Sequence, residues 1–457
     1  MKKKWITVMI ATCLSFMTMG ILSACVNENS TQSNSSPCIP EEIENQLEYK
    51  FDNSKNGYIV TGIGNYTEIS LEIPTTYNNI PVLEIADGAF FKNNSIVEVH
   101  IPDGIQRIGE CAFYKCENLK RLSIGKDVED IGSFAFYECQ KVQTLYYTAN
   151  AKLGETVFQS LGAQACANDA FTLQITFGKN VQEIEPYAFK NIYANSVNFE
   201  ENSQCVWISP CAFYDSSITE VRLPDSLTLI GTEAFYSCDT LKAVSIPANV
   251  NTISKGAFQF CTRLETVTFA ENSKLQKIGA NAFQNCIFSG IDLPDSLMKI
   301  EREAFSFCSN LVEIVIPDSV QGTIGDNAFY YCNSLQSVTI GNGVTEIGKS
   351  AFQYCLNLEN VILGNAVVFI HKEAFAATGK ILELRIPASV KYIFEFAFQG
   401  AGLIHVYFDS PEAWVGAKIS VTLTLDDISN SNKMAMWLNQ DYSQYNWVKP
   451  NKNNDSI

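Results

Sequence analysis

Histidine is scarce in this chain, which has 457 residues and only His100, His371 and His405. The three are far apart in the sequence, and no local motif joins one of them to a serine, cysteine or aspartate as a catalytic arrangement requires. No Cys-x-x-Cys pair and no phosphate-binding glycine-rich loop occurs either. The sequence therefore indicates no catalytic residue, no metal site and no cofactor, and we do not predict an enzyme.

Basic residues are also few. The chain has 32 Lys and Arg against 49 Asp and Glu, a formal net charge of -17. Residues 1–24 contain three of the lysines and no acidic residue, so the rest of the chain has 29 basic and 49 acidic residues and a net charge of -20. A surface of this sign repels phosphate backbones, and no basic stripe compensates for it. We therefore exclude nucleic acid as a partner.

Residues 1–24 have the features of an export signal. Three lysines precede a mostly apolar stretch from Trp5 to Leu22. The segment Leu22–Cys25 resembles a bacterial lipobox, so we predict that Cys25 is lipidated after cleavage in front of it. The alternative is an uncleaved membrane anchor, for which the threonines and the serine within the stretch make a marginal span. Two or three acyl chains, each contributing about 0.8 kcal/mol per buried CH₂, would hold the protein outside the cytoplasm, at the bacterial cell membrane or cell surface.

The strongest internal pattern is a recurring Ala-Phe pair. Successive phenylalanines are 22 to 25 residues apart, except for one gap of 53 residues that Phe158 divides. The paired phenylalanines are Phe90, Phe113, Phe136, Phe189, Phe213, Phe235, Phe258, Phe283, Phe305, Phe329, Phe352, Phe375 and Phe398. A fixed period of this length is typical of stacked repeats, and it predicts about 14 units of about 23 residues.

One repeat, Leu335–Cys355, illustrates the expected unit. Apolar and hydroxyl residues alternate in Ser337–Ile340, which predicts a short β-strand with one buried face. Gly341 then ends the strand, where other repeats have glycine or proline. We expect Ala351 and Phe352 on a short helical or 3₁₀ turn, with the ring in the core, where its burial contributes roughly 1.5–3 kcal/mol. The predicted fold is an α/β repeat solenoid.

This unit resembles the BspA-like leucine-rich repeat, which has the approximate pattern Leu-x-x-Ile-x-Ile-Pro-x-x-Val-x-x-Ile-Gly-x-x-Ala-Phe-x-x-Cys. The resemblance implies a leucine-rich-repeat solenoid over residues 83–408 and a family-type N-terminal cap over 47–82. Residues 25–46 are rich in Asn, Ser and Glu and predict a flexible tether. After the repeats stop, residues 409–457 are predicted to cover the last coil, and their aromatic residues are Trp414, Trp437, Tyr442, Tyr445 and Trp447.

Eight cysteines follow the repeat phenylalanine by three residues. They are Cys116, Cys139, Cys238, Cys261, Cys286, Cys308, Cys332 and Cys355. A residue in phase with the repeat is expected to be structural, and a thiol packs as a small buried hydrophobic group. The alternatives are sporadic disulfides and metal binding. Parallel side chains in register seldom have disulfide geometry, and zinc needs convergent ligands.

Two features are candidates for recognition. The first is the outward row of the strands, which is rich in hydroxyl groups, with Val315 and Ile362 as apolar exceptions; its candidate binding residues are Arg121, Ser123, Ser245, Thr266, Thr268, Ser337 and Thr339. The alternative is a merely soluble β-face. The second feature is an insertion of about eight residues at 159–169, because loops on a rigid array often carry function. The alternative is an insertion without a role.

The export signal, the open repeat surface and the lack of catalytic residues favour binding over catalysis. We predict a cell-surface binding or adhesion lipoprotein that presents its solenoid to proteins or glycans of a host or a neighbouring cell, as the resemblance also implies. The alternative is a structural or accessory envelope lipoprotein whose partners belong to its own cell. In both cases the membrane is contacted through the N-terminal lipid.

Overall fold

The computed structural model describes residues 46–167, 170–410, 415–416, 430–441, 443–444 and 446–448. The predicted lipidation residue Cys25, the signal segment and almost all of the tether lie outside these residues, as do Trp414, Tyr442 and Tyr445. The chain divides into two compact units. The N-terminal unit comprises the described residues up to Val142 together with Ala151–Leu161, and the C-terminal unit comprises Gln143–Asn150 and the described residues from Gly162 onward.

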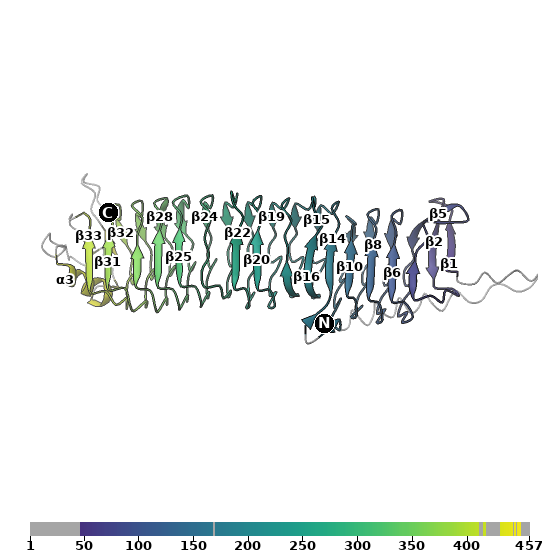
Figure 1. Ribbon diagram of the computed structural model, residues 1–457. Helices are drawn as coiled ribbons and strands as arrows, with labels where there is room; N and C mark the ends of the chain where they lie inside the picture. The colour runs from purple at the N-terminus through teal and green to yellow at the C-terminus, as the bar shows by residue number, and fades with distance from the viewer. Residues whose placement is uncertain are drawn as a thin grey trace, which may run out of the picture. The chain divides into compact units, whose positions relative to one another are not determined.

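In the N-terminal unit the strands form two parallel rows, preceded by an antiparallel hairpin (Figure 1). One row contains β1 (Glu48–Asp52), β2 (Gly57–Gly62), β5 (Ile80–Ile85), β7 (Arg107–Ile108), β9 (Asp130–Ile131) and β11 (Lys152–Leu153), with β4 (Thr76–Tyr77) paired to β5. The other row contains β3 (Ser70–Glu72), β6 (Glu98–Ile101) and β8 (Arg121–Ile124). Only the pairs β1–β2 and β4–β5 of this unit are antiparallel.

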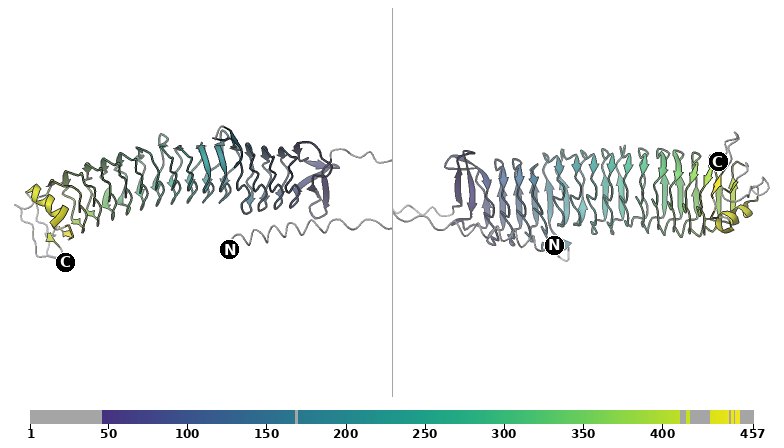
Figure 2. Two further views of the ribbon diagram at one scale, coloured as in Figure 1. Left: turned by 90° about the horizontal axis from the view of Figure 1, so that it is seen from below. Right: turned by 180° about the vertical axis from the view of Figure 1, so that it is seen from behind.

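The C-terminal unit also has two rows of strands, each divided into parallel sheets. The first contains β10 (Thr144–Tyr147), β14 (Gln174–Phe177), β16 (Tyr193–Phe199), β18 (Ser217–Val221), β20 (Ala243–Ile246), β22 (Thr266–Phe269), β25 (Glu313–Ile316), β27 (Ser337–Ile340), β29 (Asn360–Ile362), β31 (Glu383–Ile386) and β33 (His405–Phe408). The second contains β15 (Glu183–Ile184), β17 (Trp207–Ile208), β19 (Leu229–Ile230), β21 (Thr252–Ile253), β23 (Lys277–Ile278), β24 (Lys299–Ile300), β26 (Gly322–Ile324), β28 (Val344–Ile347), β30 (Phe369–Ile370) and β32 (Tyr392–Ile393). Figure 2 shows these strands side by side in successive coils.

The remaining elements lie at the insertion and near the C-terminus. A hairpin of β12 (Cys166–Ala167) and β13 (Ala170–Phe171) is antiparallel. After the last coil come β34 (Val415–Gly416), α3 (Ser431–Met436), the π-helical segment η1 (Trp437–Asp441) and β35 (Trp447–Val448). Within the described ranges, α3 and η1 are the only helical elements. The fold is thus a β-solenoid of about 15 turns.

The predicted inward and outward positions are confirmed in the repeat Leu335–Cys355. Val338 and Ile340 of β27 are buried, as are Val344 and Ile347 of β28. Ser337 and Thr339, which alternate with these two residues on β27, are half-buried and face outward. Both strands of a coil therefore contribute apolar residues to one core.

The repeat phenylalanines form a stacked column in that core, which confirms that each ring fills the interior. In the N-terminal unit the ring centroids of Phe90, Phe113, Phe136 and Phe158 are 4.9, 5.1 and 5.6 Å apart in sequence order. In the C-terminal unit the nine steps from Phe189 to Phe398 are 5.1–5.6 Å. None of these rings is more than 2% exposed. Each coil is therefore in van der Waals contact with the next through the same side chain.

The predicted helical or 3₁₀ turn of each repeat is not confirmed, because its backbone hydrogen bonds alternate in direction. In the segment Gly348–Cys355 the N–H of Ser350, Phe352 and Tyr354 donates to a carbonyl of the next coil, at 2.9, 2.8 and 3.0 Å. The intervening residues donate to the carbonyl three residues earlier in the same segment. A helix would use every one of these donors within the segment. Half of these N–H groups instead donate to the neighbouring coil.

Left-handed backbone at two positions per repeat produces this alternation. The residues two before and two after the repeat phenylalanine have positive φ from Phe90 to Phe398; around Phe352 they are Ser350 (φ 54°) and Tyr354 (φ 61°). Only Gly88, Gly256 and Gly400 place a glycine there. An L-residue in this conformation costs roughly 1–2 kcal/mol, so the contacts between coils offset a recurrent strain.

Antiparallel strands lie at the N-terminal end of the row that contains β2 and at the C-terminal end of the row that contains β32. At the N-terminal side β1 lies antiparallel to β2, and Tyr49 stacks on Tyr77 with centroids 4.0 Å apart. At the C-terminal side β35 pairs antiparallel with both β32 and β34. There the carbonyl of Asn439 accepts the N–H of Gly400 at 3.3 Å. These pairings protect the end strands of the rows that contain β2 and β32. Among the described strands of the other rows, β3 pairs only with β6, and β33 pairs only with β31.

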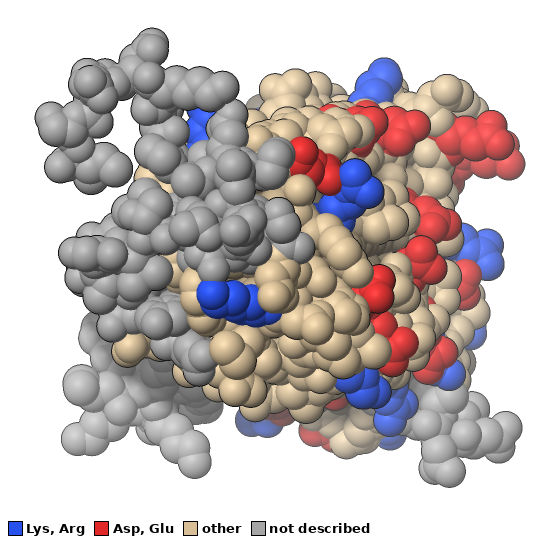
Figure 3. Space-filling view, turned by 90° about the vertical axis from the view of Figure 1, so that its left-hand side faces the viewer, with Lys and Arg blue, Asp and Glu red and all other residues tan. Residues whose placement is uncertain are grey.

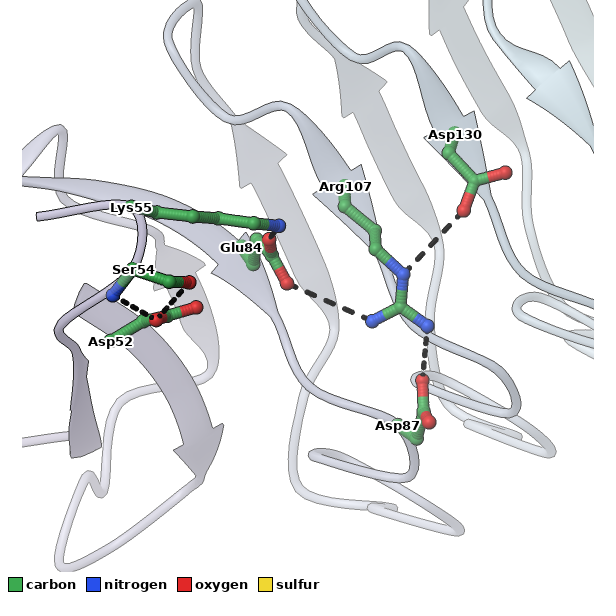
Figure 4. A network of polar contacts seen from close by, with 7 residues as sticks. All are labelled: Asp52, Ser54, Lys55, Glu84, Asp87, Arg107 and Asp130. Atoms are coloured by element: carbon green, nitrogen blue, oxygen red, sulfur yellow. Dashed lines mark hydrogen bonds and ion pairs between the residues drawn. The ribbon is translucent and has the colours of Figure 1, made fainter. Parts of the chain in front are cut away.

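An ion-pair network joins the first strands of the N-terminal unit (Figure 4). The Glu84 side chain on β5 is only 7% exposed and contacts Lys55 Nζ through Oε1. Its Oε2 is 3.8 Å from Nη1 of Arg107. The same guanidinium reaches Asp87 Oδ1 at 2.7 Å and Asp130 Oδ2 at 3.5 Å. Because a buried carboxylate without a cation is strongly destabilising, this network fixes the β1–β2 hairpin against the first coils.

The left-handed positions generate the first prediction. Ser237, at φ 55°, is half-buried, so we expect Ser237→Gly to stabilise the protein by about 1 kcal/mol, because glycine adopts this φ without a steric cost. The matched control is Ser245→Gly on strand β20, which should destabilise by roughly 0.5–1 kcal/mol. Urea unfolding followed by circular dichroism measures both. If Ser237→Gly destabilised the protein as much as the control does, the left-handed backbone at Ser237 would not be strained.

Candidate binding surface

In each unit we call the outward side chains of one strand row the strand face: the row β3, β6 and β8 in the N-terminal unit and the row from β10 to β33 in the C-terminal unit. Within each sheet the strands pair in parallel and in register, so equivalent residues of successive coils lie side by side. Ser337, for example, pairs with Glu313 on one side and Asn360 on the other. In the C-terminal unit the row is divided into the sheets β10-β14-β16-β18, β20-β22, β25-β27-β29 and β31-β33, so the columns of outward residues are regular within each sheet.

The structure places all seven sequence-predicted binding residues on the strand face. Arg121 and Ser123 lie on β8, Ser245 on β20, Thr266 and Thr268 on β22, and Ser337 and Thr339 on β27. The structure brings Ser245 and Thr268 together as register partners, and both are exposed. Arg121 and Ser123 belong to the N-terminal unit, whereas the other five belong to the C-terminal unit.

The two predicted binding residues of the N-terminal unit, Arg121 and Ser123, contact side chains of β6. Arg121 Nη2 forms an ion pair with Glu98, and Ser123 Oγ is 2.5 Å from Nδ1 of His100. The Arg121 side chain is 55% exposed, so this ion pair contributes little to stability. It does neutralise the guanidinium, which leaves Arg121 less available to a ligand than its exposure suggests.

Exposed apolar side chains extend the candidate surface beyond the hydroxyl residues. Val315 and Ile362, the two apolar exceptions in the predicted row, are 51% and 60% exposed. Tyr407 on β33 is 47% exposed, and Leu382, which precedes β31, is 54% exposed. The position of Tyr407 at an outward site of a strand was the only sequence signal that could have identified it. The strands β25 to β33 thus present apolar groups to solvent, a property common in contact surfaces.

Charged groups lie among the apolar ones on these strands, because Glu313, Glu383 and Arg385 are exposed at outward positions. In Figure 3, acidic residues lie along the right-hand side of the described surface, and scattered basic residues lie among the uncharged ones. At the last strand, His405 is half-buried, and its Nδ1 is 3.4 Å from Oγ of Ser431, the first residue of α3. The described residues of the C-terminal segment therefore contact the strand face only at its final coil.

The insertion, the second predicted candidate, forms a short hairpin. Thr172 bonds the carbonyl of Ala165 through both its N–H and its hydroxyl, each at 2.6 Å, and closes the loop between them. The two residues at the tip, 168–169, lie outside the described part of the chain. The hairpin therefore provides no side-chain geometry from which a site could be built.

The eight repeat-phased cysteines are buried and free. Each Sγ lies 3.1–3.3 Å from the carbonyl oxygen of the repeat phenylalanine in the preceding coil, and Cys355, for example, is 3.2 Å from Phe329 O. Ser216 occupies the equivalent position after Phe213, and its hydroxyl donates to Phe189 O at 2.8 Å. The column is thus a series of hydrogen-bond donors between coils, in addition to a set of packing groups.

Burial also makes these thiols poor nucleophiles. It raises the pKa of Cys139, Cys238, Cys261, Cys286, Cys308 and Cys355 well above the ordinary thiol value. Since the thiolate is the reactive form, none of the six is poised for covalent chemistry. Among the residues that the structure describes, no three His, Cys, Asp or Glu side chains are grouped so that they could hold a metal ion. The described helices include none long and apolar enough to span a bilayer.

Comparison with known proteins agrees with this architecture. The model of the BspA type leucine rich repeat region matches residues 83–161, 159–286 and 276–405, with six copies. A leucine-rich repeat protein from Bacteroides ovatus is 23% identical, with 80% of this chain and 88% of that chain covered and a TM-score of 0.54. At this identity the likeness concerns the fold alone.

Two further solved structures superpose less closely. A leucine rich cell surface protein from Faecalibacterium prausnitzii is 23% identical over 73% of this chain and 95% of that chain, with a TM-score of 0.35. The pneumococcal vaccine antigen PcpA is 17% identical over 80% of each chain, also with a TM-score of 0.35. No curated protein matches the chain.

The cysteine column predicts that the protein loses stability in mild alkali. Thiols of the unfolded chain ionise near pH 8.5, whereas the folded chain keeps its protons because burial raises the thiol pKa. The folded state then binds more protons, so stability is fully present below about pH 8.5 and falls as the pH rises toward the folded pKa, by up to about 1.4 kcal/mol per thiol and pH unit.

Urea unfolding under reducing conditions at pH 7.5 and 9.5 measures this loss. The double variant Cys261→Ser/Cys286→Ser is the matched control, because serine keeps the inter-coil hydrogen bond, as Ser216 does, but does not ionise in this range. Its loss should be smaller than that of the wild type by roughly 2–3 kcal/mol. Equal losses in the two proteins would show that the column does not titrate on unfolding.

Proposed function

The chain belongs to the family of BspA-type leucine-rich repeat proteins, and from this membership we propose that it is an extracytoplasmic binding protein without catalytic activity. Leucine-rich repeat proteins generally bind proteins or other ligands, and no catalytic family is indicated for this chain. The single observation that supports the proposal most strongly is the strand face, which repeats one weakly charged surface over many coils.

The C-terminal unit offers the best part of that face. We place the contact on β20 to β33, which carry the exposed hydroxyls of Ser245, Thr266 and Thr268 and the exposed apolar side chains of Val315 and Ile362. The centre of a protein interface is depleted in charge and enriched in apolar and aromatic groups, with polar residues around it. The same mixture of hydroxyl and apolar groups also suits a glycan, so the proposed partner is a protein or a glycan.

Location at a surface is part of the same proposal. Lipidation of Cys25 would tether the repeats outside the cytoplasm, with residues 26–46 as the spacer. Adhesion to a host or a neighbouring cell is then the proposed role. The second candidate is an accessory envelope role, in which the same face holds a component of the protein's own cell; the proposed anchoring is equally compatible with it.

Site-specific photo-crosslinking on intact cells tests the proposal. A photoreactive residue in place of Thr268 or Ile362 should capture a partner, whereas one in place of Thr323, an exposed threonine of the second strand row, should not. The purified partner should then bind residues 26–457, and Ile362→Asp should weaken this binding by about tenfold or more.

The identity of the captured molecule separates the two candidate roles. A host or neighbouring-cell protein or glycoprotein supports adhesion, whereas capture of the cell's own envelope components alone supports the accessory role. Equal capture from Thr323 would contradict the assignment of the strand face. The proposal as a whole is overturned if the purified protein binds no matrix protein, mucin, glycan or envelope component at micromolar concentration.

A further inference from the structure

Aromatic side chains gather on a second surface, formed by the turn segments that follow the repeat phenylalanines. In the N-terminal unit Phe91, Tyr114 and Tyr137 stack, with centroids 5.0 and 5.3 Å apart. In the C-terminal unit Tyr214 stacks on Tyr236 at 4.7 Å. We call this surface the turn edge. These rings are half-buried, except for Tyr114, which is 7% exposed and belongs to the core.

Lysines of the chain itself lie over several of these rings. Lys92 Nζ is 5.1 Å from the ring centroid of Phe91, and Lys115 Nζ is 5.7 Å from that of Tyr114. In the C-terminal unit Lys190 Nζ is 5.0 Å from the ring centroid of Tyr214. A cation within about 6 Å of an aromatic face is attracted by the ring quadrupole, worth about 0.5–1 kcal/mol at exposed sites. The turn edge therefore binds ammonium groups within the molecule.

One group of rings on the turn edge has no such lysine. This aromatic cluster consists of Phe307, Tyr330, Tyr331 and Tyr354, from three successive coils. Tyr331 is central, with centroids 5.4 Å from Phe307, 5.1 Å from Tyr330 and 4.8 Å from Tyr354. Phe307 is 40% exposed and the three tyrosines are half-buried. Among the cation–π contacts of the described residues, none involves these four rings.

Negative charge lies next to the aromatic cluster. Partial burial, the phenols of Tyr354 and Tyr331 and the carboxylate of Glu373 together raise the pKa of Tyr330, so Glu373 is within electrostatic range of the cluster. Glu373 accepts a hydrogen bond from Ser350 Oγ at 3.2 Å. The nearby ammonium of Lys372 is closer to Glu395, at 3.3 Å, than to Glu373, at 4.0 Å. The surroundings of the cluster thus favour a cation.

The backbone does not account for the aromatic residues of the cluster. Phe307, Tyr331 and Tyr354 have φ of 60–61°, at the position two after the repeat phenylalanine. Gly400 and Asn285 occupy the same position in other coils, and these residue types tolerate left-handed backbone. Lys92, Lys115 and Ser237 also occupy it in their coils, so the left-handed backbone selects no residue type and does not require a ring.

We propose that the aromatic cluster is a docking site for a lysine or arginine side chain in a basic segment of a partner protein. Lys92, Lys115 and Lys190 lie over rings that directly follow a repeat phenylalanine. Tyr330 has this position in the cluster, and Glu373 adds a countercharge. A net charge of -17 attracts basic segments to the protein in general. The site is separate from the strand face and does not depend on its proposed role.

Fluorescence anisotropy with a labelled peptide of alternating lysine and alanine tests the site. The protein is residues 26–457, and the reference probe is the same peptide with acetylated lysines. We expect the charged peptide to bind, the acetylated peptide not to bind, and Tyr331→Leu/Tyr354→Leu to weaken binding about tenfold, because leucine keeps apolar volume but lacks the ring quadrupole. Tyr331→Phe should bind as the wild type does, and circular dichroism confirms that each variant folds.

Three results would overturn the proposal. Unchanged affinity of Tyr331→Leu/Tyr354→Leu would mean that net charge alone attracts the peptide. Equal binding of the acetylated peptide would mean that the contact is only apolar. Loss of peptide binding in the strand-face variant Ile362→Asp, with the ring variants unaffected, would move the contact to the strand face. Because Ile362→Asp is also the variant that tests the strand face, failure of one site is distinguishable from failure of the other.

Discussion

The structure depends on the contacts that the repeat phenylalanines make with neighbouring coils through the ring, the backbone N–H and the backbone carbonyl. The Phe352 ring stacks between Phe329 and Phe375, each with its centroid 5.1 Å away. Its N–H donates to the carbonyl of Ala374 in the next coil at 2.8 Å. The carbonyl of Phe329, one coil earlier, accepts the thiol of Cys355 at 3.2 Å. Packing and hydrogen bonding thus connect the same residues, and the rings stack at a distance close to that between hydrogen-bonded strands.

The turn edge and the strand face both follow from these contacts between coils. Left-handed backbone at two positions per repeat directs alternate backbone donors of the turn segment to the next coil, and the side chains at and next to these positions form the turn edge. Because the strands lie in parallel register, outward residues line up in columns and form the strand face. One surface is rich in hydroxyl and aliphatic groups, the other in aromatic rings. The molecule therefore presents two chemically different surfaces from one repeated core.

The sequence predicted the core well and the turns poorly. The period of the Ala-Phe pair identified the column, and alternation identified the outward residues such as Thr268 and Ser337. The left-handed positions were missed because no residue type marks them: Ser350, Glu303 and Phe307 all adopt positive φ. The pairing of Arg121 with Glu98 was missed because it depends on strand register between coils. The lipidation of Cys25 and the domain boundaries remain predictions, as does binding at the strand face.

The stability of Phe329→Ala tests the central claim, that the phenylalanine column holds the coils together. Phe329 is completely buried between two rings, whereas Phe307, in the same coil as Phe305, is 40% exposed and outside the column. Urea unfolding should show a loss of about 3–5 kcal/mol for Phe329→Ala and a much smaller loss for Phe307→Ala. Equal and small losses in the two variants would contradict the claim and assign the cohesion of the coils to the backbone hydrogen bonds alone.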